Sequence, residues 1–594
     1  MIWRVVCAST LALGSVVPAY AAPLPPLLRV NAPYFTGDIV YGETAIFWFG
    51  RVTQTENYAD VRVGYNDDEL YVNMIVFDRR LWYNESPSPS DLTNWDSASL
   101  YVDMDGNVGN TPDTNAYRFD GQLNWWEPRA NWQAAYRGNG AGWATATVPF
   151  TTTTDFAWES DTEGGFNNNR NNRGWGITFH IPFASLGLSG PPTQGTLWGL
   201  GVVVHDRDAA PPASVTQETW PTQGMASDKP ATWGQLRFGL PAYSSQSAVA
   251  RGTTIIRNKL NGAVVVDGVV GGNTLCGDGA DYWTEWGDKN YAGAMQFNIQ
   301  NQAKVSDWPC SSKYYVTFPL TSTLPAGKVI ISATLTLYQK GHMGDGDPSN
   351  PGQPANIQVL TAGQDWAEST LTWNSAPMAR ENISYTLVPL MPSGVPLDPG
   401  VPRSWDVSRA VAEAYASGDS LRLALYSSES PLNTGKVFWS SDHDEYPALA
   451  RPTLTVVWGG SAAEPMAEVN KTVWPATPPA SGAPITYTIA VLGNGLALTL
   501  TDNVPTPLSF PGSVSLIGSG VVSRDSSARR ITWVGTPLVG APVTLTYVVS
   551  AVVSGPKTIT NTTVLTDSAG KSTSDTALCI VAARKVWLPL ILRQ

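Results

Sequence analysis

The segment 365–377 (DWAESTLTWNSAP) places two carboxylates beside two tryptophans, a combination that occurs where enzymes cleave sugars. Asp365 and Glu368 are the acids, and Trp366 and Trp373 supply the indoles. A glycosidase needs two carboxyl groups about 5–10 Å apart on opposite sides of a cleft. Two acids three positions apart in one loop meet that need only by accident. We therefore expect Glu368 to anchor backbone N–H groups or a cation.

The same segment predicts a strand followed by a turn. Leu371 and Trp373 alternate with two threonines, as residues on one face of a strand do. Asn374 can bond to nearby backbone in the turn, and Pro377 stops the strand. This pattern predicts that Trp373 points toward a core.

Tryptophans are concentrated in the first part of the chain. Twelve of the 24 lie between residues 22 and 240, eight between 253 and 458, and two between 468 and 582. An indole face suits the apolar face of a sugar ring, and Asn, Asp, Arg and Gln can bond its hydroxyl groups. Tryptophan is also a common filler of β-sandwich cores. The density of Trp beside Asn and Asp nevertheless favours a carbohydrate ligand.

Composition indicates an exported all-β protein. The 594 residues are too many for one core, and Gly, Pro, Thr, Ser and Val dominate short alternating runs. The net charge is −12 without a basic run, which argues against a nucleic-acid partner. Residues 1–21 predict a secretory signal, in which Arg4 precedes an apolar run and a small-residue cleavage site. We expect a secreted, extracellular or surface-associated protein whose mature chain has no transmembrane segment.

Shifts in composition divide the mature chain into three large β-sandwich domains, two linkers and a tail. The predicted segments are 22–240 (first domain), 241–252 (linker), 253–458 (second domain), 459–467 (linker), 468–582 (third domain) and 583–594 (apolar tail). Only residues 408–416 have a helical pattern. The tail is either a sorting or retention signal or a last edge strand.

The first domain carries a series of short motifs in a fixed order. They are D-x-E-L-Y-V-x-x-x-V-x-D, W-D-S-x-x-L-Y-V-D, I-P-F-x-x-L-G, V-x-x-x-D-x-D and W-G-x-L. The order resembles the family 9 carbohydrate-binding modules, which group with DOMON-like sugar and haem binders. The resemblance implies a sugar stacked on Trp95, with Trp220 or Trp233 as the second indole and Arg118 bonding hydroxyl groups. Ser99 stands where that family has an acid.

Several acids of the first domain suit calcium. Asp78 and Asp96 match aspartates of the family, some of which support calcium, and the resemblance therefore implies a structural Ca²⁺. Asp103, Asp105 and Asn107 have the alternate oxygen spacing of a calcium loop, although the full EF-hand pattern fails. Asp105 followed by Gly also reads as a hairpin turn.

Haem and nucleotides are not expected. A DOMON-like haem site needs axial His or Met, and His180 and His205 both fall in strand patterns without a paired Met. The sequence has no nucleotide-binding loop.

The second domain has its own motif set. It includes L-P-A-G-x-x-I-x-x-A-x-L-x-L-Y, W-x-E-x-T-L-T-W-N-x-x-P, W-D-V-S, F-x-S-S and R-P-T-L-x-V. The set resembles the DNRLRE-type modules of secreted bacterial proteins. The resemblance implies a jelly-roll-like sandwich that binds acidic polysaccharides such as alginate. Cys276 and Cys310 could form a disulfide in an oxidising compartment, and Cys579 is left as a lone thiol.

The third domain reads as an Ig-like sandwich with period-2 strands. Its V-x-K-T start, Y-T-I strand, T-D-x-x-P hinge and T-N-T end resemble stalk-like repeats of bacterial surface proteins, which act as spacers. Some pilin-like relatives carry a Lys–Asn isopeptide bond promoted by a buried acid. Lys471, Asn561 and Asp502 occupy suggestive positions, and the alternative is an exposed Lys and a turn-facing Asn.

Three functions are compatible with these features. The leading one is a secreted, non-catalytic polysaccharide-binding protein that supports glycan capture or degradation at the cell surface. The second is a glycoside hydrolase or polysaccharide lyase with an unrecognised acid pair, although no space remains for a catalytic barrel of about 250 residues. The third is a structural surface protein or adhesin whose binding modules are degenerate.

Overall fold

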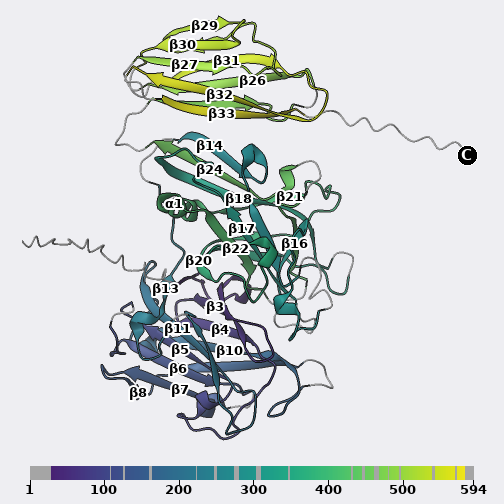
Figure 1. The fold of residues 1–594 in the computed structure, drawn as a ribbon. Helices are drawn as coiled ribbons and strands as arrows, with labels where there is room; N and C mark the ends of the chain where they lie inside the picture. The colour runs from purple at the N-terminus through teal and green to yellow at the C-terminus, as the bar shows by residue number, and fades with distance from the viewer. Residues whose placement is uncertain are drawn as a thin grey trace, which may run out of the picture.

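The fold is that of a computed structural model (Figure 1). It describes residues 28–581 except 107–108, 125–127, 159–163, 223, 246–249, 273–279, 303–309, 345–347, 430–432, 444–447, 461–466, 479–480, 494–496, 538–541 and 569–571. The predicted signal (1–21) and tail (583–594) therefore lie outside the described residues.

The first module comprises the strands up to β13. They are β1 (Arg29–Ala32), β2 (Ala45–Gly50), β3 (Tyr58–Tyr65), β4 (Glu69–Phe77), β5 (Ser97–Asp103), β6 (Ala116–Gln122), β7 (Gln133–Gly138), β8 (Trp143–Thr145), β9 (Thr151–Trp158), β10 (Asn172–Pro182), β11 (Leu197–Asp206), β12 (Thr216–Trp220) and β13 (Gly234–Phe238). Its outer sheet has the order β11-β5-β6-β7-β8, and β12 and β13 pair with the other edge of β11. Its inner sheet has the order β2-β3-β4-β10-β9.

The second module begins within the predicted first linker. It contains β14 (Ala250–Arg257), β15 (Val266–Val270), β16 (Gln296–Asn301), β17 (Ser311–Phe318), β18 (Lys328–His342), β19 (Ala355–Ala362), β20 (Ala379–Val388), β21 (Val401–Asp406), α1 (Ser408–Ser417), β22 (Leu421–Ser427), β23 (Lys436–Trp439) and β24 (Thr453–Gly460). Its inner sheet follows β20-β19-β22-β17-β15. Its outer sheet is built around β18, which pairs with β21, β23 and β24.

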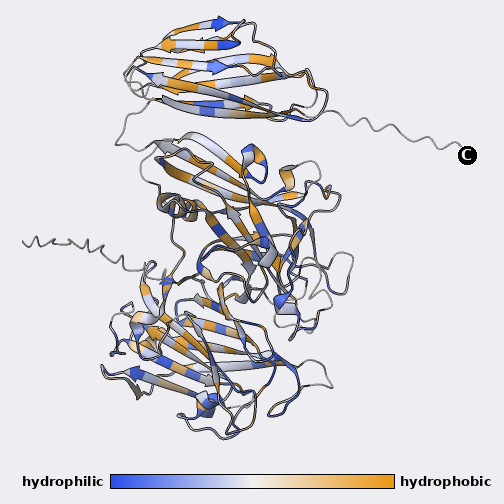
Figure 2. Cartoon of the chain, viewed as in Figure 1, coloured by the Kyte–Doolittle hydropathy of each residue, from blue (hydrophilic) through white to orange (hydrophobic). Residues whose placement is uncertain are grey.

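The third module is a separate sandwich of two antiparallel sheets. Its strands are β25 (Glu468–Trp474), β26 (Pro484–Leu492), β27 (Leu498–Asn503), β28 (Ser515–Ile517), β29 (Val521–Asp525), β30 (Arg530–Gly535), β31 (Pro542–Ser550), β32 (Lys557–Asp567) and β33 (Ser572–Val581). The sheet orders are β25-β26-β31-β28 and β29-β30-β27-β32-β33. The predicted all-β class is thus confirmed, and hydropathy alternates along the strands as a half-buried sheet requires (Figure 2).

The single α-helix among the described residues, α1, confirms the predicted helical segment. Ser408 donates its backbone N–H to Asp406 at the start, and Gly418 ends the helix with a left-handed φ of 76°. In the described part of the chain, no helix is long and apolar enough to cross a membrane.

The four sheets of the first two modules form a continuous stack. On β2, Phe47 belongs to the core of the first module, whereas Trp48 faces a different core. On β22, Leu425 belongs to the core of the second module, whereas Tyr426 faces the same core as Trp48. Because side chains alternate across a strand, both inner sheets are buried on both faces. The shared layer, here called the intermodule core, joins the two modules.

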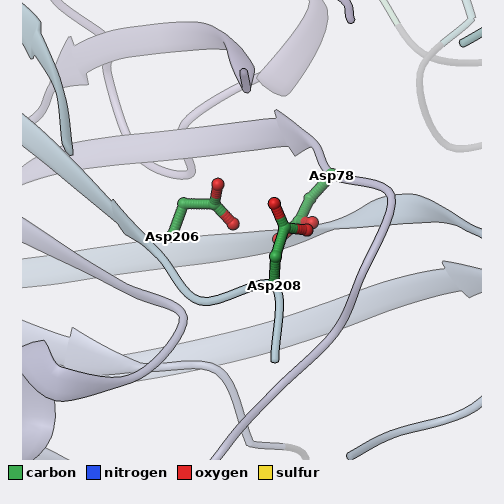
Figure 3. Close-up of side chains that lie close together, drawn as sticks. All are labelled: Asp78, Asp206 and Asp208. Carbon is green, nitrogen blue, oxygen red and sulfur yellow. The ribbon is translucent and has the colours of Figure 1, made fainter. Parts of the chain in front are cut away.

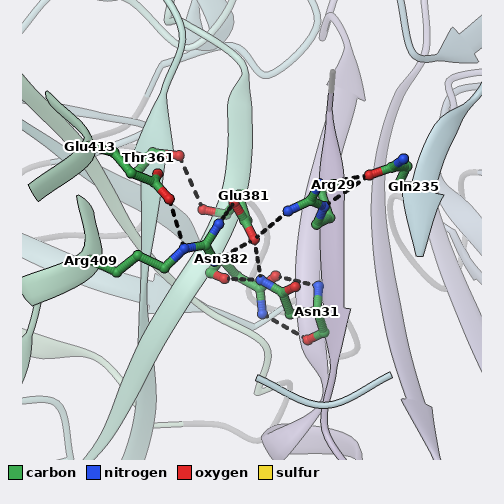
Figure 4. Close-up of polar contacts among 8 residues, drawn as sticks. All are labelled: Arg29, Asn31, Gln235, Thr361, Glu381, Asn382, Arg409 and Glu413. Atoms are coloured by element: carbon green, nitrogen blue, oxygen red, sulfur yellow. Dashed lines mark hydrogen bonds and ion pairs between the residues drawn. The ribbon is translucent and has the colours of Figure 1, made fainter. Parts of the chain in front are cut away.

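Polar contacts reinforce the intermodule core at its edge, where β1 runs beside β20 (Figure 4). The Asn31 N–H donates a hydrogen bond to Asn382 Oδ1 (2.7 Å), and Asn382 Nδ2 donates to Asn31 O (2.9 Å). Asn31 Nδ2 also donates to Glu381 (2.9 Å), which is held by Arg409 through two bonds. These partners satisfy buried polar groups across the junction, as buried backbone and amide groups require.

Lys313 lies within the intermodule core, enclosed by aromatic rings from both modules. Its Nζ is 4.2 Å from the ring centre of Trp48 and 4.5 Å from that of Tyr58, both in the first module. On the second module, the distances are 3.6 Å to Trp373 and 4.9 Å to Tyr426. Burial lowers the pKa of Lys313 well below its ordinary value.

Asp60 completes this arrangement. It accepts hydrogen bonds from Tyr58 (2.6 Å), Asn301 (2.9 Å) and Tyr426 (3.0 Å), and Lys313 donates to the Tyr58 hydroxyl (2.5 Å). A buried charge is tolerated only when it is paired and hydrogen-bonded. The network therefore depends on side chains of both modules.

The segment 365–377 contributes to the intermodule core, but the predicted strand is wrong. Residues Glu368–Thr370 form a 3₁₀ turn, and Trp373 lies in the turn that follows. The Ser375 hydroxyl donates to Thr370 O (2.8 Å) and accepts from the Thr372 N–H (2.9 Å), which closes the turn locally.

Glu368 and Trp373 have the roles predicted for them, a backbone anchor and a core residue, although the core is the one between the two modules. Glu368 accepts the N–H of Gly293 (2.5 Å), so it anchors backbone as expected. Trp373 is 4% exposed and lies in the intermodule core rather than in the core of its own module. Asn374 bonds Val52 of the first module through both its amide atoms (2.9 and 3.1 Å). The segment thus docks the second module on the first.

Cysteines are placed as follows. Cys310 is buried and disulfide-bonded, whereas Cys276 lies outside the described residues, so their pairing stays a prediction. Cys579 is a free thiol buried in the core of the third module.

Candidate functional site

Arg118 lies on the solvent side of the outer sheet of the first module. It stands on β6 directly opposite Tyr101 on β5 and Tyr136 on β7, and its guanidinium carbon is 5.8 and 5.0 Å from their ring centres. Its Nε donates to Asp120 Oδ1 (2.8 Å), and its Nη2 is 2.7 Å from Asp120 Oδ2. The Arg118 side chain keeps 21% exposure, whereas that of Asp120 keeps 1%. Arg118 is therefore a fixed cation that a ligand can reach.

Trp95 lies just before β5, at the other end of the same sheet. Its indole is half-buried, with its N–H 3.4 Å from Asp91 Oδ2 and the Arg207 guanidinium carbon 5.0 Å from its ring centre. One face of this indole is thus covered by Arg207. Four buried polar residues lie between Trp95 and Arg118 along β5 and β6, namely Ser97, Ser99, Asp120 and Gln122.

The interpretation of Trp220 and Trp233 as stacking residues is wrong for this structure. Trp220 is 1% exposed and packs on Phe47 in the core of the first module, and Trp233 is 0% exposed. Neither offers a free face: Trp220 fills the sandwich interior, whereas Trp233 lies in a separate buried cluster with Tyr101 and Val203. Trp143, which the sequence did not single out, is half-buried and stacks parallel to Trp233 at 6.2 Å. The Tyr101 ring, which flanks Arg118, contacts both indoles, with ring centres 5.8 Å from Trp143 and 5.4 Å from Trp233.

Three aspartates converge at the end of β4 and β11 (Figure 3). Asp78, Asp206 and Asp208 each place one carboxylate oxygen within 4.8 Å of the others. Asp78 and Asp206 are buried, and Asp206 Oδ1 has no hydrogen-bond partner. Burial, followed by repulsion from neighbouring carboxylates, raises the pKa of Asp78 well above its ordinary value and that of Asp206 to about 7. A bound cation would relieve this repulsion between the carboxylates.

Asp96 takes no part in that cluster through its own oxygens. Oδ2 accepts the N–H of Trp82 (2.6 Å) and Oδ1 that of Arg207 (2.8 Å). These bonds tie two loops to the start of β5, and the metal role of Asp96 stays a prediction.

Asp103 and Asp105 form a second cluster with Asp113, again with oxygens within 4.8 Å of one another. Asp103 is 1% exposed and its Oδ2 has no partner, and burial with the Asp105 carboxylate raises its pKa to about 7. Asn107, the third residue of the predicted loop, lies outside the described residues. Asp105 is followed by a turn, as the hairpin alternative requires.

The third module brings Lys471, Asp502 and Asn561 into one buried network from β25, β27 and β32. Lys471 Nζ donates to Asp502 Oδ2 (2.6 Å), and Tyr547 on β31 donates to the same oxygen (2.7 Å). Asn561 Nδ2 donates to the Tyr547 hydroxyl (2.7 Å). Asp502 and Asn561 are fully buried, and burial lowers the pKa of Lys471 to about 8. The alternative of an exposed Lys and a turn-facing Asn does not fit this geometry.

A comparison with known protein families finds one match, which falls within the second module. Residues 280–451 match the model of Carbohydrate-binding module family 96. The match begins in the loop before β16 and ends just before β24, so this family 96 region lies entirely within the second module. No curated protein sequence matches the chain.

Several solved structures are similar to parts of the chain. A family 9 carbohydrate-binding module from Caldicellulosiruptor kristjanssonii in complex with cellotriose is 17% identical, with 37% of this chain and 97% of that chain covered and a TM-score of 0.25. A putative carbohydrate-binding protein from Bacteroides uniformis is 12% identical over 36% and 99%, with a TM-score of 0.26. The collagen-binding domain of a Staphylococcus aureus adhesin is 11% identical over 18% and 94%, with a TM-score of 0.15. At these values the likenesses do not bear on what this chain binds.

Proposed function

We propose that the chain is a secreted, non-catalytic polysaccharide-binding protein that captures glycan at the cell surface. The observation that carries this proposal is the match of the family 96 region to a carbohydrate-binding family. The polysaccharide class favoured for the second module is acidic, as for alginate. Because the intermodule core covers the inner sheet of this module, its ligand has access only to the outer sheet, the edges and the loops.

The first module adds a second binding surface in this proposal. Its support is the position of Arg118, which is held against Asp120 and flanked by Tyr101 and Tyr136 while remaining accessible. Aromatic faces beside a fixed hydrogen-bond donor suit a sugar ring and its hydroxyl groups. Trp95 borders the same sheet.

Arg118→Ala is expected to weaken binding of the full chain to its polysaccharide about tenfold, because the substitution removes the charged donor and leaves Asp120 buried without its cation. Trp95→Ala is expected to weaken binding in the same direction. Affinity gel electrophoresis across plant and algal polysaccharides measures both, with Arg170→Ala as a control because Arg170 is exposed on the same module. If the wild-type chain binds none of these polysaccharides, the proposed function is rejected.

A structural surface role is the second candidate, and the burial of Trp220 and Trp233 favours it, because the first module then lacks the second predicted stacking indole. Unchanged carbohydrate affinity of Trp95→Ala and Arg118→Ala would support this role over glycan capture by the first module.

A structural Ca²⁺ in the first module belongs to the same proposal. The residues fit the ion: Asp78, Asp206 and Asp208 supply only oxygen donors, and one buried oxygen of Asp206 has no partner. Burial raises the pKa of Asp208, and the positive charges of Arg80 and Arg79 offset only part of this rise.

Calcium at about 100 times its Kd is expected to raise the free energy of unfolding of the first two modules by about 2.7 kcal/mol. Asp206→Asn should abolish that response. In EDTA the same variant should be more stable than wild type, because it removes a buried, repelled carboxylate. Thermal unfolding with and without Ca²⁺ measures both effects, and exposed Asp68→Asn is the matched control. An equal calcium response in Asp206→Asn and wild type would contradict this site.

The third module is proposed to be a spacer with an internal Lys471–Asn561 amide. The neutral Lys471 amine attacks Cγ of Asn561. The new bond joins Lys471 Nζ to Cγ, the bond from Cγ to Nδ2 breaks, and Nδ2 leaves as ammonia. Its support is the burial of the network and the lowered pKa of Lys471, which favours the nucleophilic, uncharged amine. Asp502 is placed to accept the proton that the attacking amine releases.

A further inference from the structure

A chain of side-chain hydrogen bonds crosses the outer sheet of the first module from β12 to β6. Its members are Gln217, His205, Ser99, Asp120 and Arg118. Gln217 Nε2 is 3.1 Å from His205 Nδ1, and His205 Nε2 is 3.0 Å from Ser99 Oγ. Ser99 Oγ donates to Asp120 Oδ1 (2.6 Å), and Arg118 Nε donates to the same oxygen (2.8 Å). Four adjacent strands are thereby linked.

The direction of every bond in this chain follows from the donor at its start. An amide nitrogen only donates, so Gln217 Nε2 donates to His205 Nδ1, and the proton of the imidazole must lie on Nε2. That proton is donated to Ser99, whose own hydroxyl proton goes to Asp120. Burial, with a smaller effect from the Arg118 charge, lowers the pKa of His205 to about 3, which matches a neutral ring with one donor and one acceptor.

The three middle residues of this chain of hydrogen bonds are buried, and its two end residues are accessible to solvent. Ser99, Asp120 and His205 are 0%, 1% and 4% exposed. Gln217 is exposed, and the Arg118 side chain keeps 21% exposure. A buried carboxylate needs its hydrogen bonds, because an unpaired one carries a large desolvation cost. Asp120 is therefore oriented by Ser99 on one side while it holds Arg118 on the other.

The Arg118 guanidinium is committed to the protein along one edge only. Nε and Nη2 face Asp120, whereas Nη1 has no hydrogen-bond partner within the described part of the chain. The flanking rings of Tyr101 and Tyr136 limit its rotation. The free edge suits an oxygen acceptor of a sugar, either a hydroxyl group or a uronate carboxylate.

We propose that His205 is a positioning residue of the first module, which acts through Ser99 and Asp120 to keep the Nη1 edge of Arg118 directed to a ligand oxygen. The inference rests on the proposed carbohydrate binding of this module. It makes the strength of ligand binding depend on a residue that the ligand does not touch.

The test compares two replacements of His205 in the full chain. His205→Phe fills the same space without a hydrogen bond and is expected to weaken polysaccharide binding about fivefold, whereas His205→Gln keeps a donor and an acceptor and should recover most of that loss. Ser99→Ala breaks the chain of hydrogen bonds at its middle residue and should weaken polysaccharide binding to the same extent as His205→Phe. His180→Gln, on β10 of the inner sheet, is the matched control.

Folding and positioning effects are separated by measuring the melting temperature of each variant beside its affinity. Unchanged affinity in His205→Phe and Ser99→Ala, or an equal loss in His205→Gln and His205→Phe, would overturn the positioning role. If the wild-type chain binds no polysaccharide, the proposed function fails, and ¹⁵N-histidine NMR still decides the hydrogen-bond chain. A neutral His205 ring protonated at Nε2 is expected, and a ring protonated at Nδ1 or at both nitrogens would reject the chain.

Discussion

The mass of the mature chain, with its disulfide reduced, is expected to be about 17 Da lower than its sequence predicts, because a Lys471–Asn561 amide forms with loss of ammonia. Lys471→Met and Asp502→Asn should each restore the full mass, the first by removing the amine and the second by removing the proton acceptor. The bond closes the loop between positions 471 and 561, and by the loop-entropy argument used for disulfides its loss costs about 4–5 kcal/mol. Intact-mass spectrometry and thermal unfolding measure the two effects.

The matched control for this experiment is Lys557→Met, which removes an exposed Lys from the same strand that carries Asn561. It should retain the mass deficit and the unfolding temperature. A wild-type chain at its full sequence mass would show that the bond is absent. The buried Lys471–Asp502 pair would then be a structural ion pair, and Lys471→Met would destabilise the module only by leaving Asp502 uncompensated.

Trp373→Ala is expected to destabilise the first and second modules together, by about 3–5 kcal/mol. The indole is 4% exposed, its ring centre lies 3.6 Å from Lys313 Nζ, and the ring centre of Tyr58 in the first module lies 5.0 Å away. Its loss leaves a cavity in the intermodule core and removes one ring from around a buried Lys. Because both inner sheets depend on this core, the two modules should unfold in one transition that shifts as a whole.

Differential scanning calorimetry of the full chain measures this effect. Trp474→Ala is the control, since Trp474 on the third module is 76% exposed and should change nothing. Two separate transitions for the first and second modules, with only the second shifted by Trp373→Ala, would show that the modules fold independently.

Local pattern was enough for the elements but not for their partners. The helical pattern of 408–416 predicts a helix correctly, because helix formation depends on neighbours along the chain. The segment 365–377 shows the limit. Its alternation resembled a strand, yet side-chain bonds from Ser375 closed a turn there, and Trp373 packed against another module.

The candidate sites show the same division. Motifs in the sequence identified Lys471, Asp502 and Asn561, and also Arg118 and Trp95. Their partners Tyr547, Asp120 and Gln217 were missed, because the sequence of one strand does not show which residues of the next strand lie opposite. Asp206 and Asp208 lay within a quoted motif, V-x-x-x-D-x-D, without being recognised as partners of Asp78. Trp220 and Trp233 were overvalued, because their residue type does not say which face of the sheet they occupy.

The sequence by itself determined that this protein is a series of β-sandwiches, the first two of them rich in tryptophan, since period-2 patterning and turn residues act locally. Only the tertiary structure decided that the first two sandwiches share a core. An inner strand such as β2 reads as a continuous apolar run, but that run does not say which second surface covers it. Which Trp stacks on a partner module, which is core and which remains open to a ligand depends on long-range packing, which brings together residues as distant as Trp48 and Trp373.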